Sequence, residues 1–262
     1  MPRSGDGPNV VLLHGLIRTG RSMTTLGKAL SEAGYRVCNV TYPSRHHSID
    51  VLASQYVAPS IAQCFPENKA PIAFVTHSMG GIIVRQLAAQ HAIPSLGRVV
   101  MLGPPNAGSE LVDEFGDWWL FRAINGPAAL ELGTATDSTP RRLGPATFEV
   151  GIIAGTRSRN PVWSRFFDER NDGKVSVASA ALVGMKDFLE IDENHTFIMR
   201  NREAIDQTLR FLKEGTFARN PGVTPSSVVA ERQAPVVVAP QEHVPATVRP
   251  ATHAVTAAAP AS

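Results

Sequence analysis

The chain has 262 residues, of which 43% are hydrophobic, so it can bury one large core, and we expect one folded domain. Lysine and arginine number 25 against 23 aspartate and glutamate, which gives a net charge of +2. This small excess provides no strong positive field to attract nucleic acid, and we expect no nucleic-acid partner.

The N-terminal sequence MPRSGDGPNVVLLHG has one arginine and then only a short apolar run. A signal peptide needs a longer apolar region and a small-residue cleavage site. No stretch approaches the roughly 20 apolar residues that a membrane-spanning helix requires. We therefore expect a cytoplasmic protein without a transmembrane segment, although a chain whose leader had been removed would look the same.

Short apolar runs alternate with longer segments of helical period, which is typical of βα units. The predicted strands are residues 9–14, 36–42, 71–77, 97–103, 149–155 and 187–192. The predicted helices are residues 22–33, 50–65, 79–91 and 196–213, with Gly34 and Gly215 as C-terminal caps. The pattern predicts an α/β fold with a doubly wound, mostly parallel sheet of about six strands.

Two cysteines, Cys38 and Cys64, are too few and too far apart to indicate a metal site or a disulfide framework. We expect two buried thiols, with a single bridge as the alternative. The adjacent His46 and His47 suggest an extended loop rather than a metal site, because neighbouring side chains diverge there and no carboxylates accompany them. We expect no metal and no cofactor.

Ser78 lies in FVTHSMGGIIV, where a strand pattern runs directly into a helical one. So sharp a turn strains the serine backbone and lifts its hydroxyl above the sheet edge. The turn also begins a helix, so the Met79 N–H points outward with the positive end of the helix dipole behind it. A serine that only caps the helix is the alternative interpretation.

This stretch resembles the nucleophile elbow of the α/β-hydrolase superfamily, in its lipase and esterase branch. The usual pattern is Gly-x-Ser-x-Gly, and this chain has Thr-His-Ser-Met-Gly, with Thr76 replacing the first glycine and Gly80 keeping the second. The resemblance covers about residues 8–214 and implies an α/β-hydrolase domain over residues 1–215.

In that superfamily the acid and then the histidine follow the serine along the chain. His195, between the last predicted strand and the last predicted helix, stands where these hydrolases keep their base. Asp172 matches the Asp-Gly-x-Val element of similar lipases, and Gly173 permits a tight turn there. The resemblance therefore implies a Ser78–His195–Asp172 triad, with Asp168 as the alternative acid.

Ester hydrolysis also needs two donors for the negative charge that develops on the carbonyl oxygen. The Met79 N–H is one candidate. The His14-Gly15 pair resembles the loop that lipase-like hydrolases use for the other donor, which implies the Leu16 N–H.

A Pro-x-x-Gly-Ser-like element at residues 105–109 resembles the segment that precedes a lid in lipases. We expect a cap or lid over about residues 106–145, in which Trp118 and Trp119 contact acyl chains or a lipid surface transiently. The alternative is that these aromatic side chains only pack a cap helix onto the core. The expected partner is a small-molecule or lipid ester.

Residues 216–262 contain 7 prolines and no Leu, Ile, Met, Trp or Tyr. We interpret them as a Pro/Ala/Val-rich disordered tail. The sequence as a whole predicts a serine hydrolase of carboxylic esters that works through an acyl-serine intermediate. An acyltransferase with the same triad and a catalytically silent binding protein of the same fold are the alternatives.

Overall fold

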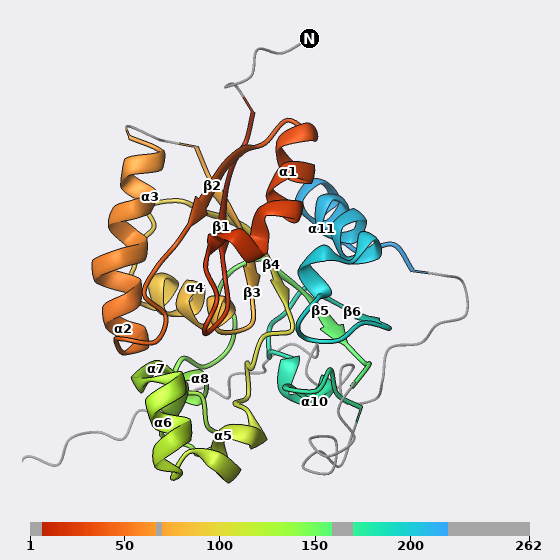
Figure 1. The fold of residues 1–262 in the computed structure, drawn as a ribbon. Helices are drawn as coiled ribbons and strands as arrows, with labels where there is room; N and C mark the ends of the chain where they lie inside the picture. The colour runs from red at the N-terminus through yellow and green to blue at the C-terminus, as the bar shows by residue number, and fades with distance from the viewer. Residues whose placement is uncertain (1–6, 67–69, 159–169, 220–262) are drawn as a thin grey trace, which may run out of the picture.

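The computed structural model describes residues 7–66, 70–158 and 170–219, and its framework is one six-stranded parallel sheet. The strand order is β2-β1-β3-β4-β5-β6, and every neighbouring pair is parallel (Figure 1). The strands are β1 Asn9–Leu13, β2 Arg36–Val40, β3 Ile72–His77, β4 Leu96–Leu102, β5 Val150–Gly155 and β6 Asp187–Ile191. The predicted doubly wound sheet is thus confirmed, and each strand lies within two residues of its predicted bounds.

Helices cover both faces of the sheet because the strand side chains alternate between two apolar clusters. Along β1, Val10 and Leu12 join one cluster, whereas Val11 and Leu13 join the other. The first cluster includes apolar residues of α1 (Thr24–Glu32) and α11 (Arg202–Glu214), and the second those of α3 (Ala58–Cys64) and α4 (Met79–Ala89). Burying one such side chain fully contributes about 1.5–3 kcal/mol, so this two-sided core provides most of the stabilisation.

Three predicted helices are divided in the structure. A 3₁₀ turn, η1 (Gly20–Met23), precedes α1, and another, η3 (Ile198–Arg200), precedes α11, whose first turn is capped by the Asn201 side chain. The segment predicted at 50–65 comprises α2 (Ile49–Val51), a π-helical stretch η2 (Leu52–Val57) and α3. Pro59 has no N–H to donate, which accounts for the irregular hydrogen bonding near it.

Cys38 on β2 and Cys64 at the end of α3 form a disulfide, with their Cα atoms 6.0 Å apart. The expectation of two thiols was therefore wrong, because packing of α3 beside β2 brings together cysteines that are 26 positions apart. None of the helices in the described ranges is long and apolar enough to cross a membrane. The cytoplasmic location stays a prediction. The disulfide argues against it, because disulfides are rare in cytosolic proteins.

The packed part of the chain extends past the predicted boundary at residue 215. Gly215 adopts the left-handed conformation of a helix cap, as predicted. Phe217 then packs against Phe211 and is buried, and Arg219 forms an ion pair with Asp187 at the start of β6. The remainder of the predicted tail, residues 220–262, lies outside the described residues.

The segment expected as a cap contains four short helices beyond the carboxyl ends of the strands (Figure 1). They are α5 Glu110–Phe115, α6 Trp119–Asn125, α7 Pro127–Leu130 and α8 Thr139–Arg142. A short helix from the loop after β5, α10 (Val177–Ala180), lies at the same end of the sheet.

Arg85 on α4 fastens the cap segment to the sheet domain. Its buried guanidinium donates to the Asn106 backbone and side-chain oxygens at 3.1 and 3.2 Å, and to Pro140 O and Gly144 O at 2.7 Å each. No carboxylate pairs with it among the residues described, and burial lowers its pKa to about 10. The Arg85 charge is thus held by oxygens at both ends of the cap segment.

We expect Arg85→Met to lower the free energy of unfolding by about 3 kcal/mol, because buried oxygen acceptors would lose their donors. Arg85→Lys should restore only part of this loss, since an ammonium group lacks the planar fork of a guanidinium. Urea denaturation measures the effect, and limited proteolysis should show faster cleavage in the cap. The matched control is Arg141→Met on the exposed side of α8; equal stability of the Arg85 and Arg141 variants would contradict the prediction.

Candidate active site

Ser78 occupies the single-residue junction between β3 and α4, with φ 53° and ψ −126°. A non-glycine residue in this region of backbone space is strained and requires tight packing around it. That packing is provided at Gly80, where a Cβ atom would lie 2.7 Å from Leu13 O and 3.0 Å from His14 O. The turn is therefore the sharp elbow that the sequence predicted.

Thr76 fits in place of the usual glycine because the residue that faces it on α4, Gly81, has no side chain. A Cβ atom on Gly81 would lie 3.4 Å from Thr76 Oγ1 and 3.1 Å from Pro104 Cβ. The second glycine of the Gly80-Gly81 pair thus leaves room for the threonine side chain, which is fully buried.

Three predicted residues meet at this elbow although they are far apart in the sequence. Ser78 Oγ lies 2.9 Å from His195 Nε2, and His195 Nδ1 lies 2.7 Å from Asp172 Oδ2. The other carboxylate oxygen, Asp172 Oδ1, accepts from the Lys174 and Val175 amides at 3.0 and 2.9 Å. With both oxygens occupied, the carboxylate favours the tautomer in which His195 Nδ1 carries the proton and Nε2 accepts from the serine hydroxyl.

The loops that carry Asp172 and His195 also bond to each other through their backbones. The His195 N–H donates to Asp172 O at 3.0 Å, so the imidazole and carboxylate are fixed at two points. Both side chains are buried. Asp168, the alternative acid, lies outside the described residues.

His77 supports the His195 loop, a role that the sequence analysis did not assign. His77 Nε2 donates to His195 O at 2.9 Å. Burial lowers the pKa of His77 well below its usual value, and the charges of His195, Arg18 and Lys174 lower it further, so the ring is neutral. The only signal in the sequence was a histidine directly before the serine.

The loop after β1 is fixed by His14, and its Gly15 lies against the elbow. The Tyr42 N–H donates to His14 Nε2 at 3.2 Å, which leaves the proton on Nδ1 to donate to Gly15 O at 2.8 Å. The His14 and Tyr42 rings also stack, with their centroids 4.0 Å apart. A Cβ atom on Gly15 would lie 2.9 Å from His77 Nδ1 and 3.0 Å from Ser78 Cβ, so only glycine permits so close an approach.

Two backbone amides beside Ser78 are available to a ligand. The Leu16 N–H follows Gly15 in the loop, and the Met79 N–H follows the serine at the start of α4. Within the described parts of the chain, neither N–H has a hydrogen-bond acceptor. The Met79 N–H was predicted from the helix start as a candidate oxyanion donor, and the Leu16 N–H was implied by the resemblance.

A cavity of about 400 Å³ opens beside Ser78 and His195. Its walls are mainly apolar and come from the loop after β1 and from the cap. The apolar lining residues are Leu16, Ile17, Pro105, Leu111, Val112, Phe115, Trp118, Leu120, Phe121, Ile124, Leu132 and Val175. Trp118 lines this cavity, whereas Trp119 does not line it and is 77% exposed, and contact of either with a substrate stays a prediction.

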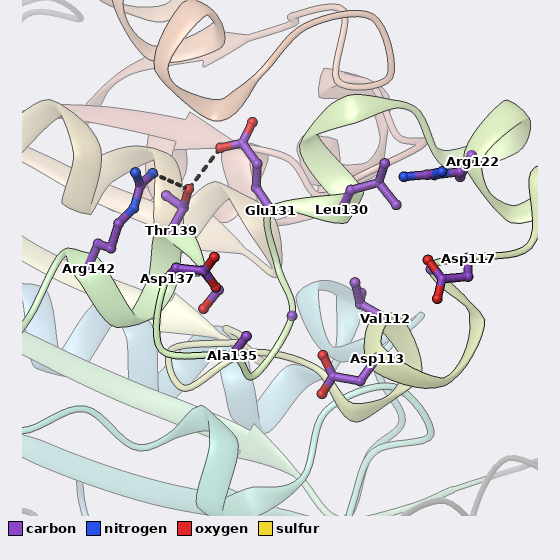
Figure 2. Close-up of a pocket in the computed structure, with 13 residues that line it drawn as sticks. Val112, Asp113, Asp117, Arg122, Leu130, Glu131, Ala135, Asp137, Thr139 and Arg142 are labelled. Carbon is purple, nitrogen blue, oxygen red and sulfur yellow. Dashed lines mark hydrogen bonds between the residues drawn. The ribbon is translucent and has the colours of Figure 1, made fainter.

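A second cavity of about 460 Å³ lies elsewhere in the cap and is polar (Figure 2). Asp113, Asp117 and Arg122 lie on one side of it and Asp137 and Arg142 on the other (Figure 2). Over residues 7–66, 70–158 and 170–219, no three His, Cys, Asp or Glu side chains cluster closely enough to hold a metal ion. This cavity includes neither Ser78 nor His195, so the first cavity is the candidate site.

Comparison with known proteins gives a family match and several structural relatives. The model of the alpha/beta hydrolase family matches residues 10–261. Lipase BlEst2 of Bacillus licheniformis in its mature form superposes with a TM-score of 0.62 at 20% identity, covering 79% of this chain and 93% of that chain. Phospholipase PlaB from Legionella pneumophila gives 0.65 at 16% identity, covering 81% and 60%. The metagenomic carboxyl esterase MGS0156 gives 0.56 at 21% identity, covering 74% and 66%.

At these identities the solved structures show a shared fold. Among curated proteins, the magnesium-chelatase 30 kDa subunit of Rhodobacter capsulatus is 34% identical over 94 residues, which are 34% of this chain. The match spans only 33% of that relative's length.

We expect Gly103→Ala to weaken the bond between His195 and Asp172. The new Cβ atom would lie 3.0 Å from Asp172 Oδ2 and 3.2 Å from His195 Nδ1, in a backbone with φ +54°. Proton NMR should show the low-field signal of the His195 Nδ1 proton shifted or lost. Gly34→Ala is the matched control, since its φ is +93° but no atom lies within 4 Å of the new Cβ; the same signal in both variants would contradict this geometry.

Proposed function

Because the chain belongs to the alpha/beta hydrolase family, we propose that it is a serine hydrolase that cleaves carboxylic esters through an acyl-serine intermediate. The observation that carries this proposal is the continuous hydrogen-bonded series from Asp172 through His195 to Ser78, at 2.7 and 2.9 Å. The series ends on a serine hydroxyl that faces a cavity of about 400 Å³.

In the proposed reaction, Ser78 Oγ attacks the ester carbonyl while His195 Nε2 takes the hydroxyl proton. Asp172 keeps the imidazole oriented and stabilises the imidazolium that forms. The tetrahedral intermediate collapses when the bond to the alkoxy oxygen breaks and His195 returns the proton to that oxygen. Water then attacks the acyl-serine by the same route, with His195 first as base and then as acid.

The Leu16 and Met79 amides are the proposed oxyanion donors. Loss of one such donor typically costs about 2.7–4 kcal/mol of transition-state stabilisation. The short approach of Gly15 to Ser78 supports this assignment, because it places the loop directly beside the reacting oxygen.

The apolar cavity supports an ester with a hydrophobic acyl group as the substrate. Its cap walls, from Leu111 to Ile124, offer aliphatic and aromatic surface to a hydrocarbon chain. The lipase, phospholipase and carboxyl esterase that share this fold agree with this class of substrate. An acyltransferase would use the same groups, with an alcohol in place of water in the second step.

We expect a fluorophosphonate probe to label the wild-type protein and not Ser78→Ala. Ser78→Ala and His195→Ala should each lower hydrolysis of p-nitrophenyl octanoate by several orders of magnitude, because the members of a triad act as a unit. Ser54→Ala, which alters an exposed hydroxyl on η2, is the control and should behave as wild type. A correctly folded wild-type protein that takes up no probe would indicate a silent binding protein instead.

We further propose that the cap touches lipid surfaces transiently. Trp118, Trp119, Leu120 and Ile124 are large apolar residues that remain exposed, and they follow one another along the same short stretch of the cap. Trp118, Leu120 and Ile124 also line the cavity, so a surface bound there would meet its mouth.

The double variant Trp118→Ala/Trp119→Ala should bind phosphatidylcholine vesicles more weakly in a flotation assay, by about tenfold, because two large apolar side chains no longer enter the interface. Hydrolysis of a vesicle-borne ester should fall more than hydrolysis of a monomeric one. Vesicle binding that is unchanged by the double substitution would rule out this contact.

A further inference from the structure

Two cationic side chains line the cavity that contains Ser78. Arg18 belongs to the loop after β1, which also carries the Leu16 amide, and Lys174 belongs to the loop after β5, which carries Asp172. Apart from the His77 and His195 rings, every other residue lining this cavity is uncharged, and no aspartate or glutamate is among them. The cavity therefore combines apolar walls with two uncompensated positive charges.

Neither cation has a partner in the described part of the chain. The Arg18 guanidinium and the Lys174 ammonium form no ion pair and no hydrogen bond there. Some other arginines of the chain do have carboxylate partners, namely Arg98 with Glu149, Arg157 with Asp192, and Arg219 with Asp187. Asp172 forms no ion pair with the Lys174 ammonium, because its two oxygens already bond to His195 and to backbone amides.

Holding the two cations together is electrostatically unfavourable. Lys174 is exposed and Arg18 is half-buried. Partial desolvation of the Lys174 ammonium lowers its pKa, the positive charge of Arg18 lowers it further, and the Asp172 carboxylate opposes both. The same two charges act on His77, beside the serine. A bound anion would offset this repulsion, and its gain would be larger in an apolar cavity than in open water.

We propose that the substrate is an amphipathic ester with an anionic phosphate or carboxylate group, which Arg18 and Lys174 bind while the hydrocarbon chain lies along the cap. This inference rests on the proposed ester hydrolysis at Ser78 and names the class of substrate for that site. A guanidinium pairs with phosphate or carboxylate through two parallel hydrogen bonds, and an ammonium adds a mobile point charge. A neutral ester would fill the apolar walls and leave both cations unpaired.

The kinetic test compares three esters with the same acyl chain: monooctanoylglycerol, octanoylglycerol phosphate and the octanoyl ester of glyceric acid. We expect the wild-type protein to have a kcat/KM about tenfold higher for at least one anionic ester than for the neutral one, the value for one charge-assisted interaction. The two anionic esters distinguish phosphate from carboxylate. The preference should also shrink as salt is added, since salt screens charges near the surface.

Substitution assigns the preference to the two residues. Arg18→Gln and Lys174→Gln should each lower the ratio of anionic to neutral kcat/KM by about threefold, so that the double variant loses the tenfold preference, and Arg18→Lys should retain part of it. Arg21→Gln is the matched control, because it removes the same charge from the exposed η1 turn outside the cavity. Equal kcat/KM values for the neutral and anionic esters, or a preference that survives in the double variant Arg18→Gln/Lys174→Gln, would overturn the inference.

A binding measurement separates this inference from the proposed function. Calorimetry on Ser78→Ala should show octyl phosphate or octanoate binding more tightly than octanol, with the difference lost when Arg18 and Lys174 are both glutamine. If no ester is hydrolysed but this binding pattern is found, the proposed function fails and the anion site stands. If esters are hydrolysed but neither anion binds more tightly than octanol, the anion site fails and the hydrolase stands.

Discussion

The hydrogen bond from His195 to Asp172 is the constraint on which the site depends. It fixes the imidazole tautomer, so that Nε2 is left to face Ser78. The bond forms because the strands are parallel, so the loops that follow β3, β5 and β6 all lie at the carboxyl ends of the strands. A second bond between the two loop backbones and the support from His77 then hold the imidazole in place. The chemistry is thus set by rigid strands, although every reacting group lies just beyond them.

The cap is attached by a different kind of force. Its helices are short and several of their apolar side chains are exposed, so hydrophobic burial holds them less firmly than it holds the sheet. Arg85 compensates with buried hydrogen bonds to both ends of the segment. This division places the reacting groups on the well-packed domain and most of the apolar cavity wall on the looser one, which allows the cavity to adapt without disturbing the triad.

Apolar runs predicted the six strands closely, because strands buried on both faces are continuous in hydrophobicity. The elbow was predicted from the strand that runs directly into a helix, whereas Asp172 and His195 were implied by the resemblance to the α/β-hydrolase superfamily, and the structure brings all three side chains together. The Arg85 contacts and the closeness of Arg18 to Lys174 were not predicted, and the Cys38–Cys64 bond was predicted only as the alternative, because each brings together distant segments of the chain. Thr76 departs from the usual glycine of the pattern, and the space left by Gly81 shows how its side chain fits.

The anchoring of Phe217 and Arg219 has a practical consequence. These residues rest on Asp187 at the beginning of β6, and the preceding Gly215 lies beside Glu149, Lys186 and Arg98 near the starts of neighbouring strands. Ser78 lies at the opposite ends of the parallel strands. A solid support or fused protein joined directly after Arg219 would therefore be attached near the amino-terminal ends of the strands, at the end of the sheet away from Ser78 and the cavity.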